Sequence, residues 1–421
     1  MDYSYQGNWG EAYLLTETNI ENLLVIGVDL VSLAKSAKKA GYEVYAVGYF
    51  GDQDLKHACL ETRSIVRQRL KRTCGRLDAN FSPEALLQST KELLKRNKIH
   101  AALLSSGLDD SSEVLFELRE LIPIVGNQPK KIREVRDKRK FFRELKRLEI
   151  PHPKTGLAEN LQEARKESKD IGFPVLVKPH NGFAGAGIRK AKHNQELKQV
   201  FHDVFRRFDE RILIQEYVPG RPASVSLISS STEAVALTLN EQILGTSEMG
   251  QREPFGYCGN IVPFSTSETI TSRCKSVAEK AVQHFGLVGS NGVDLVISEK
   301  DVPYVVEVNP RFQGSLECVE RILDVNIVKA HMEACLQGRL PLIHKHPSTS
   351  CVRLILFAPQ RSFAPNLSTF HEARDIPLKG AVIEEGEPVC SICIDGADRN
   401  SSLEKARALA TSIGESLRPT K

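Results

Sequence analysis

Short apolar runs alternate with amphipathic stretches in the first third of the chain. The runs LLVIGVD (23–29) and EVYAVGYF (43–50) are typical of buried strands, with a helix-like segment between them. Another helix and strand follow within 85–106. This order predicts an open parallel sheet wrapped by helices over 23–126, after an irregular tail at 1–22. The turn after the first strand lacks the GxGxxG spacing, which argues against dinucleotide binding there.

The segment 130–147 is strongly basic, and apolar residues recur in it at near-helical spacing. This pattern predicts one amphipathic helix that ends near Ile150 and turns most of its charges to solvent. Pro151 and Pro153 then mark a boundary, beyond which short strands are separated by glycines. A second boundary near Pro341 opens a final segment that is strand-rich at first and helical from Ser402.

A glycine-rich loop follows directly on the apolar strand FPVLVKP. The strand ends at Lys178, and Gly182, Gly185 and Gly187 come next. Glycines let backbone N–H groups close on an anion, and a nearby ammonium adds charge, so the segment predicts a cover over phosphate groups. It is not a P-loop, because the lysine precedes the glycines. A solvated lysine beside an ordinary turn remains the alternative.

The run RILIQEYVPG (211–220) predicts a second buried strand that leads into a Pro-Gly turn. It passes through Gln215 and Glu216 into Tyr217 and Val218. Such a strand edge offers backbone N–H and C=O groups between apolar side chains, which suits an adenine ring. An ordinary strand and turn has the same pattern, so this segment alone leaves both interpretations open.

The run GVDLVISEKDVPYVVEVNPR predicts an antiparallel hairpin. If Ile297 faces Tyr304, Asp294 faces Glu307, and Asn309 projects to the same side as Glu307. Opposed carboxylates repel each other unless a proton or a cation intervenes. Three oxygen donors on one face therefore predict a site for a hard cation such as Mg²⁺, with the solvent-facing side of a half-buried hairpin as the alternative.

Composition narrows the class of protein without choosing a reaction. A chain of 421 residues exceeds the size of one hydrophobic core, and 41% hydrophobic with 26% charged residues is typical of a globular enzyme. A net charge of +4 is too small to suggest a nucleic-acid or membrane-surface partner. The sequence also lacks a secretory signal pattern and an apolar run of about 20 residues, so we expect a cytoplasmic protein.

Nine cysteines are scattered along the chain without the spacing of a disulfide framework. Cys390 and Cys393 form a CxxC within the strand-like run VCSICI. Because positions three apart on a strand point to opposite faces, we expect buried structural thiols and no shared zinc or redox centre.

In this order, the segments resemble the ATP-grasp superfamily over 138–340. More narrowly, NEQILG, YCGNIVPF, EVNPRFQGS and DIPLKGAVIEEGEPVCSI are similar to predicted ATP-dependent carboligases related to biotin carboxylase and the carbamoyl phosphate synthase large chain. The resemblance implies an α/β and α+β fold. A Rossmann-like domain at 23–126 would precede a two-lobed ATP-grasp domain at 127–340 and a small C-terminal β subdomain with a terminal helix at 341–421.

The resemblance also implies ATP and Mg²⁺ or Mn²⁺ as cofactors, and it carries the family's roles onto matching residues. Arg311 would steady the reacting carboxyl or phosphoryl group, and Lys178 would act with it. The implied nucleotide-binding residues are Lys138 and Lys178 for the phosphates, Gly182, Gly185 and Gly187 for the cover, and Gln215, Glu216, Tyr217 and Val218 around the adenosine. The implied metal ligands are Asp294, Glu307 and Asn309, with Glu307 bridging.

Two departures from the family pattern bear on the substrate. Pro222 stands where many relatives place an acid that holds the ribose, although Glu216 could substitute. Ser315 stands where biotin carboxylases need a glutamate base, with Glu317 as a potential stand-in two residues later. The second departure weakens the bicarbonate interpretation.

The sequence thus predicts a ligase that activates a carboxylate as an acylphosphate and passes it to an amine. A biotin-dependent carboxylase is one alternative, although the chain has no Met-Lys-Met acceptor. A nucleotide-binding protein without turnover is another, which the intact metal trio disfavours. The expected partners are a small carboxylate and an amine, and a homodimer is compatible with the resemblance.

Overall fold

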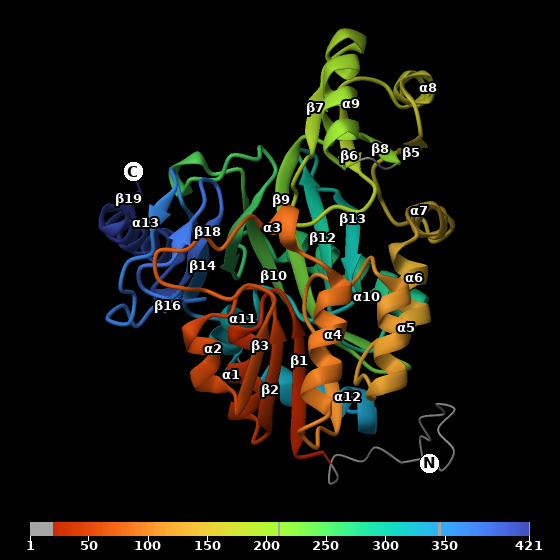
Figure 1. The fold of residues 1–421 in the computed structure, drawn as a ribbon. Coiled ribbons are helices and arrows are strands. Elements are labelled where there is room, and N and C mark those ends of the chain that lie inside the picture. Colours follow the sequence, from red (N-terminus) through yellow and green to blue (C-terminus); the bar gives the residue numbers. More distant parts are fainter. Residues whose placement is uncertain (1–19, 209–210, 344–346, 421) are drawn as a thin grey trace.

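The computed structural model describes residues 20–208, 211–343 and 347–420. Its first part is a parallel sheet in the order β3-β2-β1-β4 (Figure 1). The strands are β1 (Asn22–Gly27), β2 (Glu43–Gly48), β3 (Glu61–Ser64) and β4 (Ala101–Leu104). The predicted open parallel sheet is confirmed, whereas the tail expected at 1–22 lies almost wholly outside the described residues.

Both faces of this sheet are buried, which explains its continuous apolar runs. Alternate residues of β1 enter different cores: Leu23 and Val25 pack on one side, and Leu24 and Ile26 on the other. The helices of this part are α1 (Val31–Lys39), α2 (Gln53–Ala58), α3 (Leu77–Asn80), α4 (Pro83–Leu94) and α5 (Ser112–Leu121).

The basic segment forms two helices, α6 (Pro129–Arg136) and α7 (Lys138–Arg147), so the single helix predicted there is wrong. They are separated at Asp137, whose carboxylate caps α7 by accepting from the N–H of Lys140 at 3.0 Å. The solvated role is also wrong for two of the charges, because the side chains of Arg136 and Lys138 are only 8% and 10% exposed.

A small four-stranded antiparallel sheet in the order β5-β8-β6-β7 stands at the top of Figure 1. Its strands are β5 (Thr155–Ala158), β6 (Val175–Pro179), β7 (Arg189–Ala191) and β8 (Ile212–Glu216). The helices α8 (Leu161–Ile171) and α9 (Asn194–Phe208) pack with it around their own apolar core. This lobe carries the strand end of Lys178 and the glycine-rich loop.

An eight-stranded antiparallel sheet, β13-β12-β9-β10-β11-β14-β18-β16, forms the centre of the molecule. The C-terminal strands extend this sheet through the β11–β14 pairing, so they do not form a separate layer. The proposed boundary at 341 stays a prediction. The strands are β9 (Gly220–Ser229), β10 (Ala234–Leu244), β11 (Tyr257–Val262), β12 (Gly289–Ser298), β13 (Pro303–Asn309), β14 (Ser350–Phe357), β16 (Ala373–Arg374) and β18 (Pro388–Gly396).

Helices and a minor sheet complete the second half of the chain. The final helix starts at Arg399, three residues before the predicted start, because Asp398 caps it through the N–H of Ser401 at 2.8 Å. The remaining elements are the 3₁₀ turn η2 (Ser247–Met249), α10 (Glu268–Phe285), α11 (Leu316–Leu323), α12 (Ile327–Gln337), α13 (Arg399–Ser416) and the sheet of β15 (Ser362–Phe363), β17 (Val382–Ile383) and β19 (Arg418–Pro419). Within the described ranges, no helix is both long and apolar enough to cross a bilayer.

The two cysteines of the CxxC point to opposite faces of β18, as predicted. Cys390 packs in one core, and Cys393 packs in another with Cys318 and Cys351. The Sγ atoms of Cys318 and Cys351 lie 3.1 Å apart, and that of Cys393 lies 3.7 Å from Cys351. All nine cysteines are free thiols.

Candidate active site

A cavity of about 940 Å³ brings together segments that lie far apart in the sequence. Its wall includes the small lobe, the hairpin of the central sheet, and loops of the N-terminal and C-terminal parts. Gly187 does not line the cavity. The predicted residues that do line it are Lys138, Lys178, Gly182, Gly185, Gln215, Glu216, Tyr217, Val218, Asp294, Glu307, Asn309 and Arg311.

The carboxylates of the hairpin face each other, since Asp294 on β12 pairs with Glu307 on β13. Asp294 accepts hydrogen bonds from Asn309 Nδ2 at 2.9 Å and from Gln242 Nε2 at 2.8 Å. Burial, and then the charge of Glu307, raise the pKa of Asp294 to about 6. The two acids and the amide therefore share one face of the hairpin, with negative charge concentrated between them.

The predicted register of this hairpin is wrong at its tip, although its consequence for the two acids holds. Ile297 faces Pro303 instead of Tyr304, and a β-bulge next to Asp294 takes up the difference of one residue. The bulge also changes the parity of β13, so that Val306 lines the cavity whereas Val305 and Val308 pack into the core. A bulge leaves no clear mark in an alternating sequence, which is why the pattern missed it.

Basic side chains surround Glu307. Lys138 Nζ donates to its Oε1 at 2.8 Å, and the guanidinium of Arg136 contacts the same oxygen. Arg136 also forms a two-pronged ion pair with Asp110 at 2.6 and 2.7 Å. Burial alone would raise the pKa of Glu307, but Arg136 and Lys138 outweigh it and hold the pKa well below its usual range.

The donor set fits a hard divalent cation. Two carboxylates and one amide oxygen converge on the cavity, and oxygen ligands of this kind suit Mg²⁺ or Mn²⁺. Burial is the first cause of the raised pKa of Asp294, and the second, the negative charge of Glu307, is one that a bound cation would offset. Ionised Glu307 is available as a ligand near neutral pH.

Lys178 lies at the end of β6, where the strand delivers its side chain into the cavity. Burial is the main cause that lowers its pKa to about 8, and the nearby charge of Lys138 adds to the effect. An ammonium with reduced hydration gains more from an anionic ligand than a solvated one does. Lys178 is half-buried at the cavity wall, which disfavours the alternative of a fully solvated strand-end lysine.

The glycine-rich loop packs against the segment 253–257. Gly185 has φ +77°, and a Cβ there would collide with the carbonyl of Phe255. The carbonyl of Ala184 accepts from the N–H of Tyr257 at 2.9 Å. The N–H of Gly187, expected to face phosphate, donates instead to the carboxylate of Glu253 at 3.2 Å. In this conformation the Glu253 carboxylate therefore accepts the hydrogen bond from the Gly187 N–H that was expected to bind phosphate.

The predicted adenine edge is only partly as expected. The N–H of Tyr217 is not free, because it donates to the carbonyl of Pro174 at 3.2 Å. The side chain of Gln215 is buried and donates to Thr155 Oγ1 at 2.9 Å. Lys190 Nζ lies 3.4 Å from the centroid of the Tyr217 ring, which places a cation over the turn that follows β8.

Arg311 is held from the N-terminal part of the molecule. Its Nε donates to Asp109 Oδ2 at 2.9 Å, and Nη1 donates to the carbonyl of Phe312 at 2.9 Å. Asp109 follows β4, so the parallel sheet and the hairpin meet at this arginine. The guanidinium is thereby fixed beside Asn309 at the cavity wall.

Sequence reasoning missed four polar residues of this site: Arg136, Gln242, Asp109 and Asp110. Gln242 lies within NEQILG, and Asp109 and Asp110 form the acidic pair GLDDSS at the end of the β4 region. An acidic pair after a parallel strand was a usable signal, because such strand ends meet at one edge of the sheet. Arg136 had no distinguishing signal among its basic neighbours.

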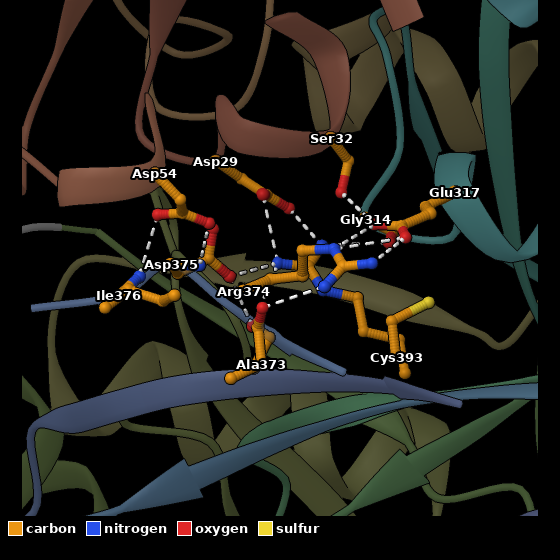
Figure 2. Close-up of polar contacts among 12 residues, drawn as sticks. Asp29, Ser32, Asp54, Gly314, Glu317, Ala373, Arg374, Asp375, Ile376 and Cys393 are labelled. Carbon is orange, nitrogen blue, oxygen red and sulfur yellow. Dashed lines mark hydrogen bonds and ion pairs between the residues drawn. The ribbon is translucent and has the colours of Figure 1, made fainter. Parts of the chain in front are cut away.

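The potential stand-in base, Glu317, is not available. Figure 2 shows its carboxylate against Arg374, whose Nη2 lies 2.8 Å away, and Arg321 Nη2 donates to it at 2.6 Å. Burial opposes ionisation, but these two arginines dominate and lower the pKa of Glu317 to about 2. Ser315 does line the cavity, yet its hydroxyl is paired with that of Ser226 at 2.9 Å.

Residues 135–315 match the family described as ATP-grasp domain. An uncharacterised protein of Methanocaldococcus jannaschii is 27% identical over 373 residues, which cover 88% of this chain and 87% of that one. The carbamoyl phosphate synthase large chain of Clostridium beijerinckii is 26% identical over 335 residues. That match covers 76% of this chain but only 30% of the synthase.

Solved structures share the fold at low sequence identity. The biotin carboxylase domain of Hydrogenobacter thermophilus 2-oxoglutarate carboxylase has a TM-score of 0.74 at 18% identity, covering 95% of this chain and 90% of that one. The L-amino acid ligase of Bacillus licheniformis has a TM-score of 0.67 at 14% identity, covering 95% and 99%. These likenesses confirm the predicted fold class, and the family match confirms the predicted resemblance.

Proposed function

We propose that the protein, whose residues 135–315 match the ATP-grasp domain family, is an ATP-dependent ligase that joins a small carboxylic acid to an amine. One observation carries the proposal: residues matched to phosphate, adenosine and metal in four separate segments line a single cavity. The solved relatives include both a carboxylase and an amino acid ligase, so the fold alone does not choose the substrate.

The proposed reaction has two steps. A substrate carboxylate oxygen attacks the γ-phosphorus of ATP, the bond to the β–γ bridging oxygen breaks, and ADP leaves. The neutral amine nitrogen then attacks the carbonyl carbon of the acylphosphate, inorganic phosphate leaves with the electron pair of the C–O bond, and the proton lost by the nitrogen passes to the departing phosphate. Both steps need alignment and charge neutralisation more than proton transfer.

The residues of the chain divide these tasks. Lys138 and Lys178 place two ammonium groups in the cavity for the phosphate oxygens, and Arg311 steadies the transferring group. Asp294, Glu307 and Asn309 would hold Mg²⁺ or Mn²⁺. When bound, the cation supplies further neutralisation of phosphate charge.

The glycine-rich loop is proposed as the lid over the phosphates. For this role the Gly187 N–H must exchange the Glu253 carboxylate for a phosphate oxygen. Closing the loop also keeps water from the acylphosphate, which would otherwise be hydrolysed. Gln215, Glu216, Tyr217 and Val218 are proposed to surround the adenosine.

The carboxylase alternative needs a base that deprotonates bicarbonate near neutral pH. Glu317, the only stand-in that the sequence suggested, is paired with two arginines and has a pKa of about 2. This pairing supports an organic carboxylate as the substrate. Free thiols throughout the chain support a cytoplasmic location, and a homodimer stays a proposal.

The test follows ADP and phosphate release from purified protein with Mg²⁺ and ATP. Pooled organic acids with and without pooled amines form one arm, and bicarbonate with free biotin forms the other. Hydroxylamine in place of the amine should trap an activated acid as its hydroxamate. Biotin-dependent ADP release with bicarbonate, and no hydroxamate from any acid, would overturn the ligase proposal.

A further inference from the structure

A second polar region of the same cavity is acidic and lies apart from the metal trio. Asp29 follows β1, and Asp52 follows β2, so both stand at the carboxyl edge of the parallel sheet. Ligands of open α/β sheets bind at this edge. Asp375, from the loop after β16, lines the same wall. We call Asp29, Asp52 and Asp375 the acidic pocket.

Arg353 on β14 holds two of these acids in place. Its guanidinium donates to Asp29 at 2.5 and 3.0 Å and to Asp375 Oδ2 at 3.0 Å. Arg353 is only 4% exposed, so this pairing is buried and geometrically fixed. One guanidinium therefore serves two carboxylates, and the third acid of the pocket adds a charge that Arg353 does not pair.

A fourth carboxylate increases the imbalance. Asp54 accepts from the backbone N–H groups of Asp375 and Ile376 at 3.1 and 2.9 Å (Figure 2), and the cation nearest to it, Lys35 Nζ, is 3.8 Å away. Burial raises the pKa of Asp375 to about 6, with Asp29 and Asp54 adding to the effect against Arg353. With all four acids ionised, the cluster holds more negative charge than Arg353 and Lys35 neutralise, and the raised pKa values of Asp52 and Asp375 reflect this crowding and their burial.

Asp52 is the group that points to a ligand. It is 6% exposed and lines the cavity. It occupies the N-cap position of α2, yet its side chain makes no capping hydrogen bond. Across the described ranges, its carboxylate accepts no hydrogen bond from another residue, and burial together with the charges of Asp375, Asp54 and Asp29 raises its pKa well above the usual range. A buried acid without a partner is costly, so the usual structural reason for an aspartate here is absent.

The acidic pocket adjoins the chain segment that carries the proposed catalytic groups. Gly314 follows Asn309 by five residues, and its carbonyl accepts from Arg353 Nη1 at 2.9 Å. A Cβ on Gly314 would lie 3.0 Å from Arg353 Nη1 and 3.3 Å from Asp29 Oδ2. A molecule in the pocket would thus lie beside the segment between Asn309 and Gly314.

We propose that the acidic pocket binds the protonated amino group of the amine substrate, which passes one proton to a carboxylate of the pocket before the neutral nitrogen attacks the acylphosphate. The inference rests on the proposed ligase function and names the chemistry of its second substrate. An ammonium group supplies the charge that Asp29, Asp52 and Asp375 lack, and its three N–H donors can reach more than one carboxylate. An anionic group would add to the repulsion, and a hydroxyl would leave the excess charge in place.

Calorimetry on the full chain with Mg²⁺ and a non-hydrolysable ATP analogue tests the pocket without turnover. The probes are 1,4-diaminobutane, 1,4-butanediol and succinate, which share chain length but differ in charge. We expect the diamine to bind at least about tenfold more tightly than the diol, and succinate, which can enter the proposed carboxylate site, not to displace the diamine. Equal affinity for diamine and diol, or displacement of the diamine by succinate, would overturn the assignment.

Variants place the effect on Asp52. Asp52→Asn and Asp52→Ser both keep a favourable N-cap residue, so α2 should fold, and each should weaken diamine binding about tenfold. Glu113→Gln removes an exposed acid of α5 and should change nothing. Unchanged diamine affinity in both Asp52 variants would contradict the proposal. Binding of the ATP analogue is measured in the same experiments. If the unchanged protein does not bind the analogue, that result counts against the ligase function, whereas the diamine titration decides the pocket in either case.

Discussion

Replacing Arg136 by alanine should destabilise the protein and disorder the metal site together. The guanidinium connects Asp110, from the loop after β4, to Glu307 on β13. Alanine keeps the helical propensity of α6 but removes the donors that Arg136 supplies to both acids, and leaves Lys138 Nζ as the donor to Glu307. Asp110 and Glu307 then lose the guanidinium that they share. Glu307 also loses a main cause of its low pKa.

The burial of the three side chains sets the magnitude. Arg136 is 8% exposed, and Asp110 and Glu307 are 25% and 28% exposed. Removing one partner of a buried ion pair costs about 3–5 kcal/mol, and the partial exposure of the two acids favours the lower end, about 3 kcal/mol. For a folding unit of about 150–250 residues, a loss of about 3 kcal/mol corresponds to a fall of roughly 6–12 °C in Tm.

Thermal unfolding followed by far-UV circular dichroism measures the effect, with and without Mg²⁺. Arg139→Ala is the matched control, because it removes an exposed arginine at the start of α7. The control should shift stability by less than about 0.5 kcal/mol. If Arg136→Ala behaves like this control, the ion pairs with Asp110 and Glu307 do not stabilise the site, and the reasoning fails.

Further changes probe the residues proposed to bind the nucleotide and the metal ion. Lys178→Ala should raise the Kd for ATP by one to two decades, about 1.5–3 kcal/mol, while the exposed Lys166→Ala should not; equal effects by calorimetry would contradict the assignment. Because the pKa of Lys178 is lowered to about 8, its charge is lost as pH rises, so ATP affinity should fall between pH 7 and 9, and Lys178→Arg should flatten this dependence. Glu307→Gln should abolish Mg²⁺-dependent ADP release in a folded protein, whereas Asp294→Asn should mainly raise the Mg²⁺ concentration required. Pro222 predicts that 2′-deoxy-ATP is accepted nearly as well as ATP, and a hundredfold loss of activity would show that another group holds the ribose.

The fold was predictable where a short-range pattern determines it. Apolar runs with the helical segments between them are enough to predict the parallel sheet, since both faces of such a sheet are buried. The break between α6 and α7 was not predictable from amphipathic spacing, because the apolar residues keep their period across Asp137. Likewise, nothing local shows that the C-terminal strands extend the central sheet, because pairing between β11 and β14 joins segments far apart in sequence.

The residues of the candidate site were likewise predictable only where a short-range pattern determines their positions. Asp294 and Glu307 were paired correctly from the hairpin pattern, but the bulge that turns Val306 toward the cavity depends on backbone geometry that alternation does not encode. Arg136 was hidden among solvated basic residues, since its burial comes from acids on other elements. Asp52 carries no distinguishing signal in the sequence, because its N-cap position without a capping hydrogen bond is visible only in the structure.

The contact between Arg311 and Asp109 bears on how the two substrates could be coordinated. Arg311 belongs to the segment that follows the metal trio, whereas Asp109 belongs to the parallel sheet, which also supplies Asp29 and Asp52. A shift of that sheet relative to the hairpin would therefore move the proposed amine pocket and the arginine at the reacting group together. Binding of the amine and alignment of the acylphosphate then depend on one interface. Its two ion pairs, Arg311 with Asp109 and Arg353 with Asp29, both use acids at the carboxyl edge of the parallel sheet.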